Sequence, residues 1–407
     1  MNSRAGVAQT RKLSNRIRSL LADEKTGAQI YLLAFSIFLC GECLGTTMFQ
    51  IPGRVYVLVK AVAVVLIAIK IILFDQYRAR SFWIMVCMLA VGALVIVSSG
   101  YTEAFFWICM VVGAKNVPFK KILQIYLIIS VSIVLLAFCA SLLDVIENLQ
   151  YERDDGYIVR NSFGILYTTD FASHIFSIVL VAFYLLRDRL RIYHYVIAVV
   201  LAVLVYRFCY TRVDVICIFL LIGVFIVVNL WDRGHLLSKK FRTGEKNTLL
   251  FRWCMPILAG IMVALTALYS SDNRILYRIN TILSDRLAYG KLGFTRFSVT
   301  LFGQYAPMEG NGSTVVHLKD YFFVDCSYLY VLFRYGLIFL LIVLAVYVLC
   351  CRKFRKDYYF LAAVLVVSVN CMIAHHLVEL AYSPFALALL AAVPDETTEK
   401  QRLLWLR

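Results

Sequence analysis

The stretch Val55–Phe74 reads VYVLVKAVAVVLIAIKIILF, twenty residues in which Lys60 and Lys70 are the only charges. An α-helix rises about 1.5 Å per residue, so a run of this length crosses a hydrocarbon core of roughly 30 Å. Its apolar residues are continuous, whereas a strand of a membrane β-barrel would alternate. Similar runs fill most of the chain, of which 62% is hydrophobic. We therefore expect an all-α, polytopic helical membrane protein in which residues 1–407 form a single integral membrane domain.

Outward from this stretch, we predict about twelve transmembrane helices. They cover residues 29–49, 55–74, 81–98, 101–114, 122–143, 171–186, 193–209, 213–230, 253–270, 326–350, 358–379 and 381–394. The segment Tyr193–Leu230 is too long for one crossing, so we divide it at Arg207–Asp214, where charged residues interrupt the apolar run. The last of the twelve is short for a crossing, and a re-entrant segment is the alternative for it.

The 41 Lys and Arg residues indicate the orientation of these spans. With the N-terminus inside, 27 of them fall in cytoplasmic segments, 11 in outer segments and three inside spans. Lys and Arg near span ends are typically retained in the cytoplasm, so this excess favours that orientation. Cytoplasmic loops thus explain the formal net charge of +16, and we expect no nucleic acid as a partner.

One long polar insertion, Ser271–Asp325, separates two apolar runs, and we expect the chemistry of the protein there. It lies on the outer face by this orientation and contains six basic residues. Within it, Arg274–Leu287 has apolar residues at helical spacing, which predicts a short helix lying in the membrane interface. Arg286 departs from the pattern because it projects near the apolar stripe. Either the helix ends before Arg286, or this side chain points into the protein. A smaller outer loop covers Asp144–Asp170.

Three more outer arginines stand where loops meet spans, namely Arg160, Arg207 and Arg212. Arg160 begins the sequence RNSFG, in which Gly164 allows a tight turn. Arg207 and Arg212 flank a short turn beside Asp214. The structural alternatives are a snorkelling arginine for the first and a self-satisfied ion cluster for the other two. Polar residues at membrane depth are costly and usually functional, and a guanidinium suits bidentate binding of phosphate.

Candidates for a general base lie at the end of the large loop and beyond it. Asp325 stands where the loop meets the next span, so its carboxylate could cap that helix or take a proton from a substrate. His317 and His376 are also on the outer face by this topology. The spacing of His375, His376 and Glu379 could bind a metal ion. No further ligand set accompanies these three residues, so we predict no metal.

Several short motifs follow one another along the chain, namely Arg160–Gly164, Thr211–Arg212, Ser284–Leu287, Leu301–Gly303, Val324–Leu329 and Gly336. They resemble motifs of the Wzy-type polysaccharide polymerases of the O-antigen ligase/polymerase superfamily, which are bacterial membrane proteins with many spans and one large outer loop late in the chain. Their order and spacing across residues 160–336 support the resemblance, whereas the first 150 residues match only in hydropathy.

The resemblance implies a membrane glycosyltransferase, a polysaccharide polymerase at the outer face of the bacterial cytoplasmic (inner) membrane. It would join O-antigen, capsule or exopolysaccharide repeat units carried on undecaprenyl pyrophosphate, without a cofactor. The growing chain would move from its lipid carrier onto a new lipid-linked unit. The partners implied are this lipid-linked oligosaccharide, membrane lipids, a chain-length regulator and a flippase.

Transferred by position, Arg212 and Arg286 would hold the pyrophosphate leaving group, with Arg160 and Arg207 as further candidates. A carboxylate or an imidazole would take the proton from the acceptor hydroxyl. Ligase-type relatives often have a His where this chain has Asp325. The assignment of the base therefore stays open among Asp325 and the two outer histidines, His317 and His376.

Two other functions stay open beside the polymerase. A ligase that moves polysaccharide to a different acceptor would use the same chemistry. A transporter or flippase of lipid-linked sugars would bind them without transferring them. Spans broken by Gly and Pro near the membrane midplane would favour a transporter, and of the prolines only Pro256 and Pro384 lie within the predicted spans away from their ends.

Overall fold

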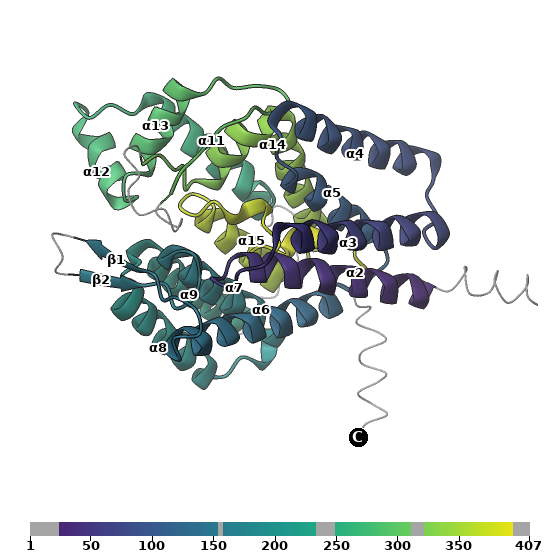
Figure 1. The fold of residues 1–407 in the computed structure, drawn as a ribbon, viewed down its shortest axis with the longest axis horizontal. Helices are drawn as coiled ribbons and strands as arrows, with labels where there is room; N and C mark the ends of the chain where they lie inside the picture. The colour runs from purple at the N-terminus through teal and green to yellow at the C-terminus, as the bar shows by residue number, and fades with distance from the viewer. Residues whose placement is uncertain (1–23, 154–157, 233–248, 311–320, 394–407) are drawn as a thin grey trace, which may run out of the picture.

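The structure of the protein is a computed structural model that describes residues 24–153, 158–232, 249–310 and 321–393. Within these residues, nine helices are long and apolar enough to cross a membrane. They are α2 (Glu24–Gly45), α3 (Gly53–Leu73), α4 (Ala79–Ser99), α6 (Phe119–Leu142), α7 (Thr168–Leu186, followed by the short 3-10 helix η1, Arg187–Arg189), α8 (Ile192–Cys209), α9 (Arg212–Asp232), α11 (Leu249–Leu268) and α14 (Ser327–Lys353). An all-α chain with several membrane-spanning helices, as predicted, is confirmed (Figure 1).

The described residues provide nine such helices where we predicted twelve. The helices α5 (Glu103–Gly113) and α15 (Tyr358–Asn370) have 11 and 13 residues, which is too short to cross a bilayer at 1.5 Å per residue. Residues 381–393 of the predicted span 381–394 form no α-helix. Of the residues that the structure describes beyond Asn370, 371–393, two short stretches form 3-10 helices, η3 (His376–Val378) and η4 (Phe385–Leu389). High hydropathy indicates only that a segment is buried, and these segments are buried by the surrounding protein.

The residues 371–393 form what we call the return segment, which runs from the end of α15 back to the start of α6. There, Ala392 accepts a hydrogen bond from the backbone of Phe119 and donates one to the carbonyl of Val117. Non-helical backbone at membrane depth is tolerated only where protein satisfies its polar groups. The Tyr126 hydroxyl donates to the carbonyl of Ala381 at 2.7 Å, and the Lys353 ammonium donates to three more carbonyls. The re-entrant alternative for this segment thus fits better than a crossing.

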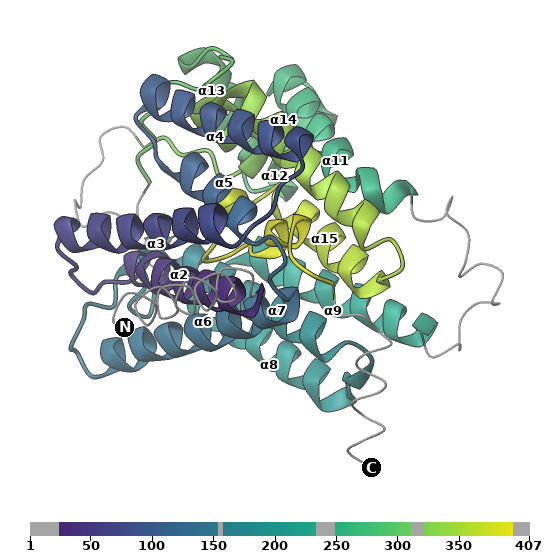
Figure 2. The same cartoon turned by 90° about the vertical axis from the view of Figure 1, so that its right-hand side faces the viewer.

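The helices surround the return segment as a ring. Successive contacts link α3, α2, α6, α7, α9, α15, α11, α14, α4 and α5, and α5 closes the ring on α3. The 3-10 helices of the return segment contact α5 and α14 from inside this ring. In both views the return segment, in yellow, lies between the group formed by α6 to α9 and the group formed by α4, α11 and α14 (Figures 1 and 2). The ring therefore has a buried, non-helical centre.

The helix α14 is broken at Gly336, where φ is 85° and ψ is 172°. The loop before α14 fills the break, because the backbone amides of Leu337 and Ile338 donate to the carbonyls of Thr300 and Leu301. A Cβ atom on Gly336 would lie 2.5 Å from the carbonyl oxygen of Leu301, so a larger residue does not fit. Part of the large loop is therefore anchored within the ring.

The large loop contains two helices where we predicted one interfacial helix over Arg274–Leu287. These are α12 (Arg274–Ile282) and α13 (Arg286–Arg296). Within α12, Ile275 and Ile282 are each 71% exposed, as expected for an apolar face directed at lipid. The smaller loop contributes an antiparallel hairpin of β1 (Gln150–Arg153) and β2 (Ile158–Asn161). Figure 1 shows the hairpin and α12 at the same end of the molecule.

The predicted division of Tyr193–Leu230 into two helices is correct. The helix α8 ends at Cys209, Tyr210 adopts a left-handed conformation with φ of 52°, and α9 begins at Arg212. The turn needs neither glycine nor proline, because one residue in the left-handed region is enough to reverse the chain.

Candidate functional site

Ionisable side chains from four distant parts of the chain meet at the end of the helical ring where the large loop lies. Asp170 lies in the first turn of α7, Arg286 begins α13, Asp325 precedes α14, and His376 and Glu379 belong to the return segment. We call these five residues, together with His375, the polar centre. Asp214, buried in the first turn of α9, interacts electrostatically with Arg286, Asp325, His376 and Asp170, so the group is contiguous.

Arg286 is turned into the protein. Its guanidinium lies 3.3 Å from the Asp325 carboxylate and donates to the carbonyls of Ser284, at 2.8 Å, and Ile373, at 3.3 Å. Its side chain is only 14% exposed. Both possibilities left by the sequence pattern hold, because the helix ends before Arg286 and the side chain points inward. Arg286 and Asp325, both predicted site residues, are brought together.

The turn before Arg286 is held in an uncommon conformation. Ser284 and Asp285 have φ of 50° and 68°, values that non-glycine residues adopt rarely. The buried Asn280 side chain stabilises this turn, since it donates to the Asp285 carboxylate at 2.7 Å and accepts from the amide of Ala288 at 3.0 Å. Asn280 thus positions Arg286 without touching it.

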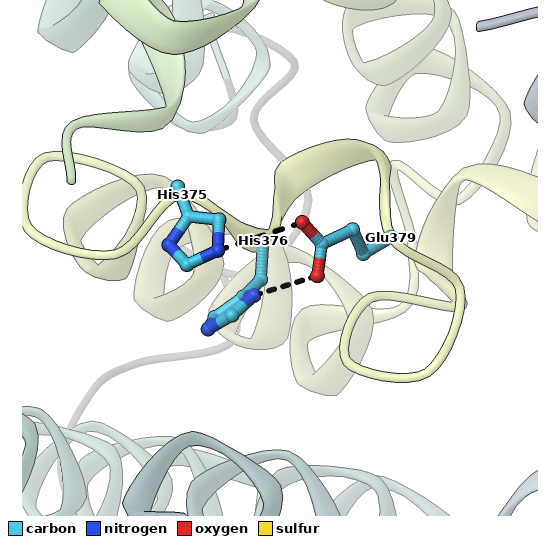
Figure 3. A group of neighbouring side chains, drawn as sticks. All are labelled: His375, His376 and Glu379. Carbon is cyan, nitrogen blue, oxygen red and sulfur yellow. Dashed lines mark hydrogen bonds and ion pairs between the residues drawn. The ribbon is translucent and has the colours of Figure 1, made fainter. Parts of the chain in front are cut away.

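The histidines share one carboxylate, as Figure 3 shows. The Nδ1 atom of His376 lies 2.8 Å from one oxygen of Glu379, and Nε2 of His375 lies 3.6 Å from the other. On its far side, Nε2 of His376 faces the Asp170 carboxylate at 3.6 Å. Both nitrogens of His376 therefore face acids, an arrangement that favours the doubly protonated imidazolium.

The same three residues are the group that could hold a metal ion among the described residues, since one ligand atom from each of His375, His376 and Glu379 lies within 4.8 Å of the others. An imidazole binds metal through a lone pair, and the imidazolium favoured at His376 has none. We therefore assign no metal to this group, and the expectation of metal-independent chemistry stays a prediction.

The other predicted arginines lie apart from the polar centre. Arg160 donates to the carbonyl of Cys209 at 3.0 Å and to the hydroxyl of Thr168, and it stacks on the Tyr167 ring at 5.5 Å. Since Thr168 lies two residues before Asp170, Arg160 stands at the rim of the centre. Arg207 and Arg212 are exposed at the turn between α8 and α9. His317 lies outside the described residues.

A group of tyrosines borders the polar centre. The rings of Tyr289 and Tyr321 are 5.5 Å apart, and those of Tyr151 and Tyr167 are 4.8 Å apart. Tyr321 interacts with Asp325 and with Tyr167, so the two pairs are neighbours. Burial, and then the Asp325 carboxylate, raise the pKa of Tyr321, so its phenol stays a hydrogen-bond donor. Tyrosines from both the smaller and the large loop thus line one rim.

Sequence reasoning missed most of the neighbours of His376. Asp170 appeared only as the end of the smaller loop, and Tyr382 and His174 were not considered. The Tyr382 ring lies 3.8 Å from that of His376 and 4.2 Å from that of His174, whose Nε2 is 2.9 Å from the Thr46 hydroxyl. A carboxylate in the first turn of the apolar helix α7 and a histidine one turn later in the same helix were the available signals, since charged or titratable groups at membrane depth rarely lack a role.

By fold and site, the protein is a multi-pass helical membrane protein with a polar centre at one end of a helical ring. Comparison with family models, with curated proteins and with solved structures gives no significant match to this chain.

Proposed function

We propose that this protein is a membrane glycosyltransferase that polymerises undecaprenyl-pyrophosphate-linked repeat units into surface polysaccharide. The observation that supports this most is the inward Arg286, paired with Asp325 beside a histidine flanked by two acids. Arginine and a carboxylate in one site supply what glycosyl transfer from a pyrophosphate needs. The arginine stabilises the leaving group, and the carboxylate takes a proton.

In this proposal the pyrophosphate competes with Asp325 for Arg286. A guanidinium binds phosphate oxygens in a bidentate manner, and it neutralises charge that develops as the sugar–phosphate bond breaks. The electron pair of that bond leaves with the pyrophosphate oxygen. Loss of its ion pair makes Asp325 a stronger base, because a nearby positive charge had favoured the deprotonated form. Donor binding would thereby activate the base.

The acceptor sugar completes the reaction. Its hydroxyl oxygen forms the new bond to the sugar carbon and its proton passes to Asp325, which is 26% exposed and so more accessible than His376 at 5%. In this proposal His376 contributes positive charge near the pyrophosphate. Arg160 and the neighbouring tyrosines are placed to bind sugars at the rim, and the exposed Arg207 and Arg212 attract the charged head group.

The proposal is tested with purified protein in lipid nanodiscs and lipid-linked repeat units as the only sugar substrate. Arg286→Ala is expected to abolish long polymer, a loss of at least roughly a hundredfold in rate, as for removal of one oxyanion-stabilising group. Arg278→Ala is the matched control, since Arg278 is an exposed arginine of the same loop. Normal polymer from Arg286→Ala would contradict the proposal.

A transporter of lipid-linked sugars is the second candidate, and two observations favour it. The helix α14 is broken at Gly336, and α15 gives way to the non-helical return segment at Asn370. Such breaks are typical of transporter binding sites. Vesicles containing the protein separate the two functions. A transporter moves the lipid-linked unit across the bilayer unchanged, whereas a polymerase lengthens it. A ligase would lengthen nothing until a different acceptor is added.

A further inference from the structure

A second group of charged residues borders the return segment. Glu42 of α2 and Lys60 of α3 form an ion pair at 2.9 Å, and the Tyr56 hydroxyl donates to Glu42 at 2.7 Å. Their side chains are 13% and 9% exposed. The Lys60 ammonium is also 4.3 Å from the centroid of the Tyr56 ring and 5.1 Å from that of Phe106. Ionised groups within a bundle of this kind are costly and usually functional.

Between this pair and the polar centre lies a small cavity. Its polar lining consists of Glu42, Lys60, Glu103 and Glu379, and Trp107 is among the apolar residues that close it. Its volume of about 10 Å³ is close to what one water molecule needs, and a buried water is stable where two to four polar groups can bond to it. One oxygen of Glu103 is buried without a hydrogen-bond partner among the described residues. The cavity thus offers room for a water and a group that lacks a partner.

Glu379 connects the cavity to the polar centre. It lines the cavity, and its two carboxylate oxygens face His375 at 3.6 Å and His376 at 2.8 Å. His375 in turn interacts electrostatically with Asp325. A row of titratable groups therefore leads from Asp325 through His375 and Glu379 to Glu103.

The charges of the cavity and the polar centre, taken together, do not balance. The acids are Glu42, Glu103, Glu379, Asp170, Asp214 and Asp325, whereas the cations are Lys60, Arg334, Arg286 and an imidazolium at His376. The other groups that interact with Glu103 are tyrosines, which are neutral when protonated: Tyr56, Tyr101, Tyr330 and Tyr335. An uncompensated charge is disfavoured in a low-dielectric interior, so the acids have a reason to bind one more proton.

We propose that the cavity lined by Glu42, Lys60, Glu103 and Glu379 holds a water and receives the proton that the reaction releases. This rests on the proposed glycosyl transfer. The acceptor hydroxyl gives its proton to Asp325, the proton moves by way of His375 and Glu379 to the water, and Glu103 takes it up. Asp325 returns to the carboxylate form, and Glu103 holds the proton until it returns to solvent.

Infrared difference spectroscopy tests the cavity without any sugar substrate. The purified full-length protein is titrated in nanodiscs, and the carbonyl stretch of a protonated, buried carboxyl is followed with and without exchange into D₂O. We expect the wild type to show this band, its frequency to shift in D₂O, and the band to be absent from Glu103→Gln. The control Glu309→Gln, at an exposed position, should retain it. An unchanged spectrum in Glu103→Gln would overturn the proposal.

The polymer assay then tests the role of the cavity in turnover. Glu103→Gln, nearly isosteric, is expected to lower kcat by roughly tenfold or more with KM for the lipid-linked unit unchanged. The deficit should shrink as pH rises, since solvent then removes the proton from Asp325 directly. A deficit equal at every pH would indicate a merely structural role and overturn the relay. If the wild type makes no polymer, the proposed glycosyl transfer fails, while the infrared result still decides whether Glu103 binds a proton.

Discussion

The turn before α13 and the turn before α9 are alike in construction and differ in where they direct an arginine. Each reverses the chain through non-glycine residues of positive φ, namely Ser284 and Asp285 in one turn and Tyr210 in the other. Each places an arginine as the first residue of the next helix, Arg286 and Arg212. Positive charge is unfavourable at a helix N-terminus, so both positions need a reason other than helix stability.

The surroundings make the difference between these two arginines. Arg286 faces Asp325 and two carbonyls and is mostly buried, whereas Arg212 is exposed and bonds the hydroxyl of Tyr210 at 2.7 Å. The return segment lies opposite the turn before α13, and its residue Ile373 supplies one of the two carbonyls that bind Arg286. The same local pattern thus gives a mostly buried site residue at Arg286 and a surface residue at Arg212. The rest of the fold decides which of the two an arginine becomes.

The largest contrast is expected from replacing each arginine with lysine. Lysine retains the charge and loses the planar fork, so Arg286→Lys should lower the polymerisation rate by about a hundredfold. Arg212→Lys should leave the rate nearly unchanged, because a surface charge acts at longer range. Rates are measured with the lipid-linked unit in nanodiscs. Equal losses in the two variants would break the comparison.

Removing the side chain that supports the turn before α13 should have the next largest effect. Asn280→Ala deletes two hydrogen bonds of a buried side chain, for which we expect a loss of about 1–3 kcal/mol in stability. Polymerisation should fall along with it, because Arg286 loses its fixed position. Thermal unfolding and polymer yield are measured together. Replacing the exposed Asn273, the N-cap residue of α12, by Ser is the control and should alter neither.

Removing the exposed Arg212 should have a smaller effect that depends on salt. Arg212→Ala should raise KM for the lipid-linked unit by a few fold and leave kcat unchanged, because an exposed charge attracts the pyrophosphate from solution. High salt should abolish the difference, since it screens exposed charges. The defect of Arg286→Ala should persist at the same salt concentration. A salt-independent defect in Arg212→Ala would place this arginine in the site.

The smallest effect is expected from a change in the turn before α9. Tyr210→Gly removes a left-handed non-glycine residue and its hydroxyl contact with Arg212. Relief of about 1 kcal/mol of backbone strain is offset by the entropy of glycine, so stability should change by less than about 1 kcal/mol. Polymer yield should stay near that of the wild type. A strong loss would show that this turn also positions a site residue, with Asp214 the first candidate.

Much of the fold follows from the sequence, and the exceptions share a cause. Within the residues that the structure describes, nine predicted spans became helices long enough to cross a membrane, and the division within Tyr193–Leu230 was correct. The predicted spans 101–114, 358–379 and 381–394 did not become helices of that length. A segment surrounded by protein needs the same apolar composition as one surrounded by lipid, so hydropathy cannot separate the two.

The candidate site was found in part. Arg286 stood out because it broke a helical pattern, and Asp325 and His376 were chosen as polar residues near membrane ends. Glu379 was grouped with His375 and His376 by its spacing, whereas Asp170 was not recognised as a partner of His376, since it comes from α7. The ion pair of Glu42 with Lys60 was likewise not predicted, because it joins α2 to α3 across the ring.

The sequence by itself determined that this chain is helical and apolar enough to enter a membrane, because periodicity and length act locally along the chain. It also determined that Arg286 would be unusual. Only the tertiary structure decided that Arg286 is mostly buried and Arg212 exposed, and that Asp170 and Glu379 flank His376. Ion pairs and cavities depend on which segments meet in space. In this protein the return segment, which no local pattern predicts, brings them together.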